Sequence, residues 1–184
     1  MGTILDRVTI VPDTKDWTWV LEAPCPECGF RAGSFPREEI PARLRANVDA
    51  WRAVFAGPGD LRVRPRPDKW SPLEYGCHVR DVFRLYTYRL ELMLTEDDPA
   101  YPNWDQDETA IKERYGEQDP ATVATELAAA GDRLAGAFEA VHGDQWLRTG
   151  NRSDGARFTV ESFARYLLHD PVHHLYDVTG RPAA

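Results

Sequence analysis

Apolar residues recur every three or four positions in four separate stretches of this chain, and each stretch begins at a helix start signal. The second stretch opens on a capping box, in which Ser71 and Glu74 flank Pro72. Each helix must bury one apolar stripe, and a bundle is the simplest way to do so. The chain is therefore predicted to be all-α, with long helices over residues 37–57, 71–94, 119–143 and 159–180.

The connections between these helices further define the predicted bundle. The segment 95–118 is too long for a tight turn, and it contains a short helix that Asp105 caps, Glu108 supports and Gly116 ends. We therefore expect a four-helix bundle with a long crossover between helices 2 and 3. The segment 148–158 is typical of a turn-rich loop or short hairpin.

The N-terminal residues do not follow the helical pattern. Trp17, Trp19 and Leu21 alternate with polar or smaller residues, which favours an extended arm lying on the bundle. The predicted organisation is thus an arm over residues 1–36 and a bundle over residues 37–180.

Composition excludes several classes of protein. A hydrophobic fraction of 42% argues against a disordered chain, and a net charge of -8 argues against a general nucleic-acid binder. No apolar run approaches the roughly 18 residues of a membrane span, and the N-terminus lacks the apolar core of a signal peptide. We expect a cytoplasmic protein with no nucleic-acid or membrane partner, and a homodimer is compatible with the sequence.

Three histidines form the most informative pattern. His169 and His173 are four residues apart on the last helix, so their side chains lie one turn apart on one face. His78 is predicted to face the interior from the second helix, where a lone histidine is usually a hydrogen-bonded core residue. Together the three fit an open metal site completed by water or substrate. His174 points about a quarter-turn from His173 and is predicted to support the site, while Pro171 either aims the two imidazoles or disturbs them.

These residues resemble a known family. His78 in Trp70-Ser71-Pro72-Leu73-Glu74-Tyr75-Gly76-Cys77-His78 and the pair in His169-Asp170-Pro171-Val172-His173 are similar to the motifs of the DinB-like metal-binding four-helix bundles. This family includes the bacillithiol and mycothiol S-transferases. The resemblance covers residues 37–180 and implies a zinc or nickel ion held by His78, His169 and His173. The Cys-Pro-Glu-Cys-Gly arm lies outside it and resembles a feature of an actinobacterial subgroup.

Cysteines and carboxylates supply further candidates. Cys25 and Cys28 fit a structural turn, a separate metal site or a redox pair, and no second cysteine pair completes a zinc ribbon. Glu74 and Asp81 lie one turn on either side of His78, where either could orient its ring. For both, the alternative is structural: a capping box for Glu74 and a surface ion pair for Asp81.

The sequence therefore predicts a metal-dependent thiol S-transferase that acts on an electrophilic small molecule. The metal would stabilise the thiolate of a low-molecular-weight thiol, the form that attacks. Because arginine greatly outnumbers lysine, as in GC-rich bacterial genomes, mycothiol is the expected thiol. Arg148, Arg152 and Arg157 are candidates for binding its polar groups. The alternatives are a metal-dependent hydrolase or isomerase and a non-catalytic metal-binding stress-response protein.

Overall fold

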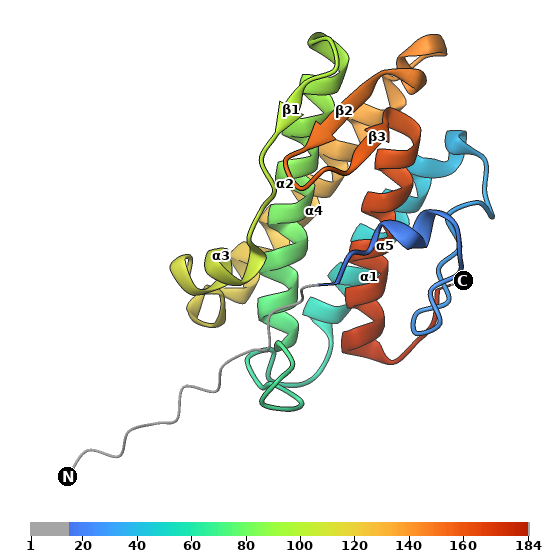
Figure 1. The fold of residues 1–184 in the computed structure, drawn as a ribbon. Helices are drawn as coiled ribbons and strands as arrows, with labels where there is room; N and C mark the ends of the chain where they lie inside the picture. Colours follow the sequence, from blue (N-terminus) through green and yellow to red (C-terminus); the bar gives the residue numbers. More distant parts are fainter. Residues whose placement is uncertain (1–14, 184) are drawn as a thin grey trace.

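The computed structural model describes residues 15–183, and four long helices make up most of it (Figure 1). These are α1 (Ile40–Ala56), α2 (Pro72–Thr95), α4 (Pro120–Glu139) and α5 (Val160–Thr179). α4 packs against α1 and α2, α5 also packs against α1 and α2, and direct contacts between α1 and α2 are few. The helices adjacent in sequence, α1 and α2, therefore lie diagonally across the bundle. The predicted all-α four-helix bundle is confirmed.

The helix ends form where the sequence predicts them, because side chains bond the free backbone groups there. Ser71 accepts a hydrogen bond from the Glu74 backbone N–H, and the Glu74 carboxylate accepts one from the Ser71 N–H. Thr159 likewise forms a capping box with Ser162 at the start of α5, and the Asp119 side chain accepts a hydrogen bond from the Thr122 N–H at the start of α4. Gly180 ends α5 with φ +68°, a conformation that glycine adopts without strain. Each N-terminal cap contributes about 0.5–2 kcal/mol.

The long crossover between α2 and α4 is also confirmed. It contains the strand β1 (Ala100–Tyr101) and the helix α3 (Gln106–Lys112), which Asp105 caps through the Glu108 N–H. The segment 148–158 contributes a hairpin of β2 (Thr149–Arg152) and β3 (Arg157–Thr159). β1 pairs in parallel with β2, which makes a small three-stranded sheet that the sequence did not predict. Two-residue strands carry no period from which to predict them.

The arm differs locally from the predicted extended form. Residues Thr18–Leu21 form a 3₁₀ turn, because the Asp16 carboxylate accepts hydrogen bonds from the Thr18 N–H (2.9 Å) and hydroxyl (3.0 Å). Beyond this turn the arm packs on the bundle and buries apolar side chains that include Phe30 and Phe35. Residues 1–14 of the predicted arm lie outside the described residues.

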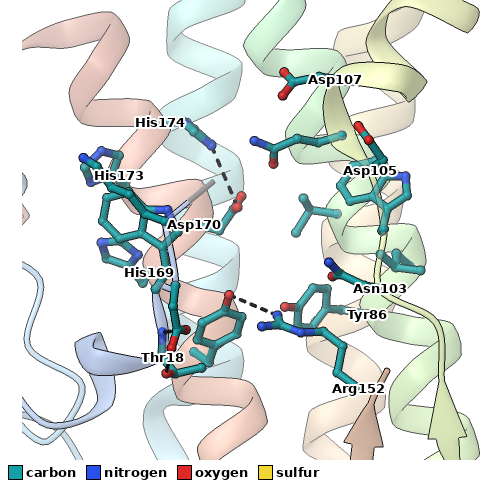
Figure 2. Close-up of a pocket in the computed structure, with 18 of the residues that line it drawn as sticks. Thr18, Tyr86, Asn103, Asp105, Asp107, Arg152, His169, Asp170, His173 and His174 are labelled. Atoms are coloured by element: carbon teal, nitrogen blue, oxygen red, sulfur yellow. Dashed lines mark hydrogen bonds and ion pairs between the residues drawn. The ribbon is translucent and has the colours of Figure 1, made fainter. Parts of the chain in front are cut away.

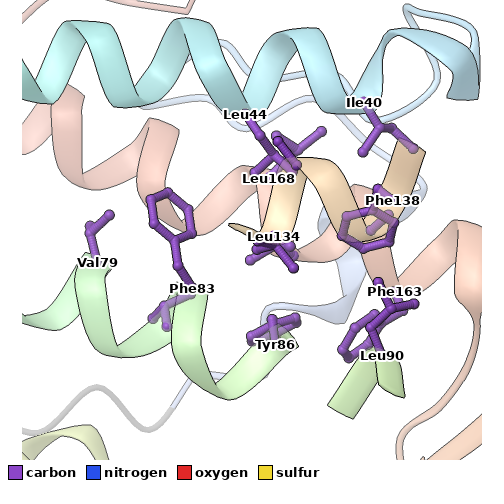
Figure 3. Packing of buried hydrophobic residues seen from close by; sticks show 14 of the residues in the cluster. Ile40, Leu44, Val79, Phe83, Tyr86, Leu90, Leu134, Phe138, Phe163 and Leu168 are labelled. Carbon is purple, nitrogen blue, oxygen red and sulfur yellow. The ribbon is translucent and has the colours of Figure 1, made fainter. Parts of the chain in front are cut away.

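The bundle core consists of the apolar stripes that the helical period predicts. Leu44, Phe83, Leu134 and Phe163 are buried where the four helices meet (Figure 3). α4 packs closely against its neighbours at Gly131, where a Cβ atom would overlap Val48 and crowd Phe83. Within residues 15–183, no helix is both long and apolar enough to cross a bilayer.

Candidate metal sites

Helix α5 carries two adjacent rows of metal-binding side chains. His169 and His173 form one row, and Asp170 and His174 form the next, each pair four residues apart. The helix continues without a break through Pro171, whose carbonyl accepts a hydrogen bond from the Asn47 amide (3.1 Å). Trp51 Nε1–H donates to the same carbonyl (3.4 Å), and these bonds help to set the rotation of α5 against α1. The two rows meet different groups of side chains.

The second row meets α2 in a group that we call the pocket triad, made of His78, Asp170 and His174. Their ligand-type atoms all lie within 4.8 Å of one another. His78 Nε2 is 3.2 Å from Asp170 Oδ1, and His174 Nε2 is 3.8 Å from Asp170 Oδ2. His78 is fully buried, and its other nitrogen, Nδ1, has no hydrogen-bond partner among residues 15–183. Two imidazoles therefore direct Nε2 toward one carboxylate.

A second carboxylate stands behind the pocket triad. The His174 Nδ1–H donates to Asp177 Oδ2 (3.1 Å), and Lys69 Nζ donates to Asp177 Oδ1 (2.7 Å). Burial alone would lower the pKa of His174, but the charges of Asp170 and Asp177 raise it. Burial opposes ionisation of Asp170 as well, yet His78 and His174 hold its pKa well below the usual value. The site is thus a negative centre flanked by two imidazoles, an arrangement that attracts a cation.

The pocket triad adjoins a cavity of about 1280 Å³ between α5 and the crossover, which Asp170 and His174 line together with His169 and His173. Figure 2 shows Asp170 and His174 on one side, facing Asn103, Asp105 and Asp107 on the other. Trp104 stacks on His78 with ring centroids 5.4 Å apart. The walls thus combine aromatic faces with many carboxylates.

The first row of α5 meets the arm in a different group, which we call the arm tetrad: Cys25, Cys28, His169 and His173. All four side chains are buried, and their ligand-type atoms lie within 4.8 Å of one another. Cys25 Sγ is 3.6 Å from His173 Nδ1. Burial raises the pKa of Cys28 to about 12 and, with the neighbouring His173, lowers the pKa of His169 to about 4. The two histidines at this position are consequently neutral near pH 7, the form that binds metals.

The structure thus divides the three predicted metal ligands between two groups. Within residues 15–183, His78, His169 and His173 do not form a common group: His78 belongs to the pocket triad, and the other two belong to the arm tetrad. His174, predicted to support the site, lies in the pocket triad itself.

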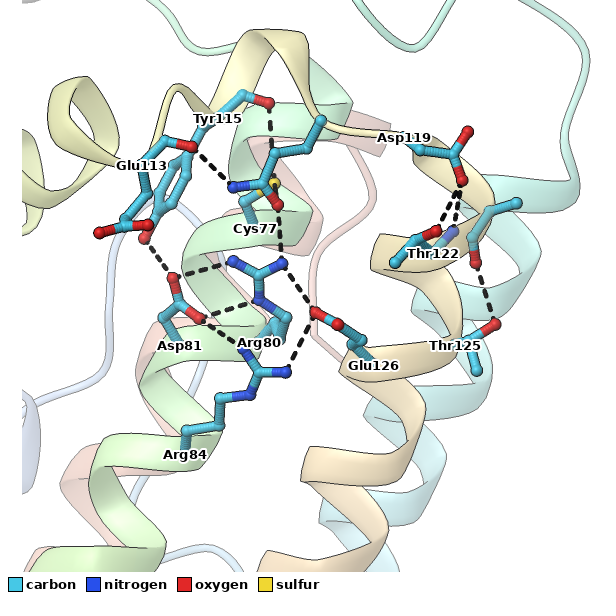
Figure 4. A network of polar contacts seen from close by, with 12 residues as sticks. Cys77, Arg80, Asp81, Arg84, Glu113, Tyr115, Asp119, Thr122, Thr125 and Glu126 are labelled. Carbon is cyan, nitrogen blue, oxygen red and sulfur yellow. Dashed lines mark hydrogen bonds and ion pairs between the residues drawn. The ribbon is translucent and has the colours of Figure 1, made fainter.

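The remaining predicted site residues have identifiable partners. Glu74 completes its capping box and pairs with Arg64. Asp81 accepts hydrogen bonds from Tyr115 Oη (2.6 Å) and Arg80 Nε (2.9 Å) in a network between α2 and α4 (Figure 4). Glu74 therefore has the capping-box partner, and Asp81 the arginine partner, that the sequence analysis gave as the structural alternatives.

Of the three arginines predicted to bind polar groups, one lines the cavity. Arg152 faces it and donates to Tyr166 Oη (3.1 Å). Burial lowers the pKa of Arg152, but the hydrogen bonds to Asp154 and Tyr166 raise it by more, so the guanidinium stays charged. Arg148 instead donates to the Met93 carbonyl (2.6 Å), and the largely exposed Arg157 pairs with Asp98.

Sequence reasoning missed Asp170 as a candidate ligand. The available signal was its spacing, because Asp170 and His174 are separated by the same four residues as the histidine pair.

The fold is a four-helix bundle that carries two candidate metal-binding groups. The sequence pattern of the DinB superfamily matches residues 43–178, and the chain belongs to this superfamily. A solved structure, YfiT from Bacillus subtilis, has a similar fold: it is 21% identical with a TM-score of 0.58, and the match covers 90% of this chain and 86% of that one. YfiT is described as a probable metal-dependent hydrolase with an unusual four-helix bundle topology. No protein of curated function matches the chain significantly.

Proposed function

We propose that this protein is a metal-dependent thiol S-transferase whose zinc or nickel ion is held by the pocket triad. The observation that carries the proposal is the convergence of His78, Asp170 and His174 at the edge of the large cavity. Tetrahedral zinc with bonds of about 2.0–2.2 Å keeps its nitrogen and oxygen ligands about 3.4 Å apart. Asp170 Oδ2 lies 3.4 Å from His78 Nε2 and 3.8 Å from His174 Nε2, at and slightly above that value, so the donor set fits the ion.

Three protein ligands suit a catalytic rather than a purely structural ion, because they leave a coordination position open. The ligand atoms would be Nε2 of His78, Nε2 of His174 and one oxygen of Asp170. Asp177 holds the ring of His174 through Nδ1, and such carboxylate–histidine pairs orient metal ligands and strengthen them.

When bound, the ion would lower the pKa of a thiol and so supply a nucleophile at neutral pH. The residues around it would position that thiol and its electrophile. Arg152 keeps its positive charge inside the cavity and would bind polar groups of the thiol. The rings of Trp70 and Trp104, both within 5.4 Å of the His78 ring, restrict water on that side of the site.

The size of the cavity favours transfer between two molecules. Sites for one drug-sized ligand are about 300–1,000 Å³, and this cavity of about 1280 Å³ has room for a thiol and a second substrate. Its aromatic, carboxylate and amide lining suits a hydroxyl-rich thiol such as mycothiol. Such a thiol stays reduced in the cytoplasm, where we place the enzyme.

A metal-dependent hydrolase is the second candidate. Two histidines and one carboxylate also hold the ion of zinc hydrolases, in which water is the nucleophile. The similar structure, YfiT, is described as a probable enzyme of this class.

An assay of metal-loaded protein with and without thiols separates these functions. We expect a generic electrophile to be consumed only when a thiol is added, and His174→Ala to abolish the activity. His142→Ala is the matched control, because His142 is exposed and belongs to neither group. Turnover of ester or amide substrates without thiol would favour the hydrolase. Equal thiol consumption by wild type and His174→Ala would refute the transferase.

A further inference from the structure

We propose that the arm tetrad is a second, structural zinc site of the Cys₂His₂ type, which fastens the N-terminal arm to α5. The four ligands come from distant parts of the chain: Cys25 and Cys28 from the arm, His169 and His173 from α5. This inference does not depend on the proposed function, because the two groups share no residue.

The geometry fits tetrahedral zinc. Bonds of about 2.3 Å to sulfur and 2.0–2.1 Å to nitrogen place a sulfur ligand and a nitrogen ligand about 3.6 Å apart. Cys25 Sγ and His173 Nδ1 are separated by 3.6 Å. Because no pair of ligand atoms in the tetrad is more than 4.8 Å apart, one ion can reach all four with small side-chain adjustments.

The backbone of the arm is shaped to present both sulfurs together. The Gly29 N–H donates to the Cys25 carbonyl (2.9 Å), and the Cys25 N–H donates to the Phe30 carbonyl (2.9 Å). Gly29 has φ +77°, which permits this tight turn directly after the second cysteine. The C-terminal residues close over the turn, since the Ala183 N–H donates to the Cys28 carbonyl (2.6 Å). The cysteine turn is therefore held in place from both sides.

The buried ligand-type atoms of the arm tetrad indicate that it binds an ion. In the described part of the chain, His169 Nε2 is buried without a hydrogen-bond partner, and Cys28 is fully buried. Buried polar atoms in native proteins are almost always bonded. The rings of Trp17 and Phe30 lie 5.2 Å and 5.6 Å from the His169 ring and cover part of it. A closed set of four protein ligands in an aromatic shell is typical of structural rather than catalytic zinc.

The arm tetrad lies where a bound zinc ion would also affect the pocket triad and the cavity. His169 and His173 each directly precede a member of the pocket triad, Asp170 and His174. The arm also contributes Asp16, Trp17 and Thr18 to the cavity wall. Zinc in the arm tetrad would therefore fix both the helix that carries the pocket triad and one wall of the cavity.

Metal analysis of the full-length protein tests this inference. Wild type loaded with zinc and freed of excess should retain about one more equivalent per chain than the double variant Cys25→Ser, Cys28→Ser. After cobalt substitution, wild type should show thiolate-to-metal charge-transfer absorption in the near ultraviolet, and the double variant should lack it. Cys77→Ser is the matched control: Cys77 is a buried free cysteine outside the tetrad, so this variant should behave as wild type.

A second variant distinguishes loss of a metal ligand from loss of metal through misfolding. Cys28→His replaces one ligand by another and should retain the zinc equivalent while weakening the charge-transfer absorption. The inference is overturned if the double variant binds as much zinc as wild type, or if cobalt-loaded wild type lacks thiolate absorption. It is equally overturned if the two cysteines form a reversible disulfide while metal content stays unchanged, because they would then be a redox pair. His174→Ala should leave the cobalt–thiolate bands intact, which separates this site from the pocket triad.

Discussion

Asp177→Asn should weaken metal binding at the pocket triad while preserving the fold. Asp177 accepts hydrogen bonds from His174 Nδ1 (3.1 Å) and Lys69 Nζ (2.7 Å), and its side chain is only 6% exposed. Asparagine has the same shape and can still accept one bond, but it lacks the negative charge that strengthens His174 as a ligand.

The expected magnitude follows from that lost charge. Hydrogen bonds to charged groups contribute about 1.5–3 kcal/mol, and about 1.4 kcal/mol corresponds to a factor of ten in affinity. We therefore predict a metal affinity about 10- to 100-fold lower, in line with the usual effect of removing such a partner.

Competition with a chromophoric chelator measures this change, in a background that lacks Cys25 and Cys28 so that only the pocket triad binds. Asp68→Asn is the matched control, since Asp68 lines the same cavity but is exposed and pairs with Arg66. Unchanged affinity in Asp177→Asn would show that Asp177 does not support a metal ligand.

Three further predictions concern the fold and the cavity. Gly131→Ala should lower the free energy of unfolding by about 1–3 kcal/mol, because the new Cβ atom has no room, whereas Gly136→Ala, where the space is open, should leave it unchanged or raise it. Equal effects of the two substitutions in chemical denaturation would refute the packing described at Gly131. Burial raises the pKa of Glu74, but the hydrogen bonds from Arg64 and Ser71 lower that pKa overall. The ionised Glu74 side chain therefore adds to the free energy of unfolding above about pH 4.5, and this contribution is lost as the pH falls. Glu74→Gln should therefore lower the free energy of unfolding by about 1–2 kcal/mol at pH 7, and by progressively less as the pH falls below about 4.5. An effect in urea denaturation that does not change with pH would contradict this. Arg152→Met should raise KM for the thiol without loss of metal, unlike Arg157→Met, which should match wild type; an unchanged KM in Arg152→Met would exclude this role.

Local signals were enough to predict the bundle. Ser71, Asp119 and Thr159 each bond the backbone N–H three positions further on, so the sequence itself contains the partners that fix each of these helix starts. The 3₁₀ turn at Thr18 escaped prediction because one side-chain contact to Asp16 outweighed the alternating pattern.

The division of the histidines could not be predicted from spacing. Asp170 and His174 repeat the four-residue step of His169 and His173, and one residue along a helix is a rotation of about 100°. Which row faces His78 depends on how α5 is rotated in the bundle, and long-range contacts such as that of Pro171 with Asn47 fix this rotation. The meeting of Cys25 with His173, 148 residues later, likewise depends on tertiary packing.

The proposal that the pocket triad binds a metal ion is tested most directly by measuring metal content in a protein whose arm tetrad has been disabled. In the Cys25→Ser, Cys28→Ser background, about one divalent ion per chain should remain, bound by His78, Asp170 and His174. Adding His174→Ala should remove that ion, and adding His173→Ala should leave it in place. Loss of the ion in His173→Ala with retention in His174→Ala would contradict the account and return the site to His78, His169 and His173.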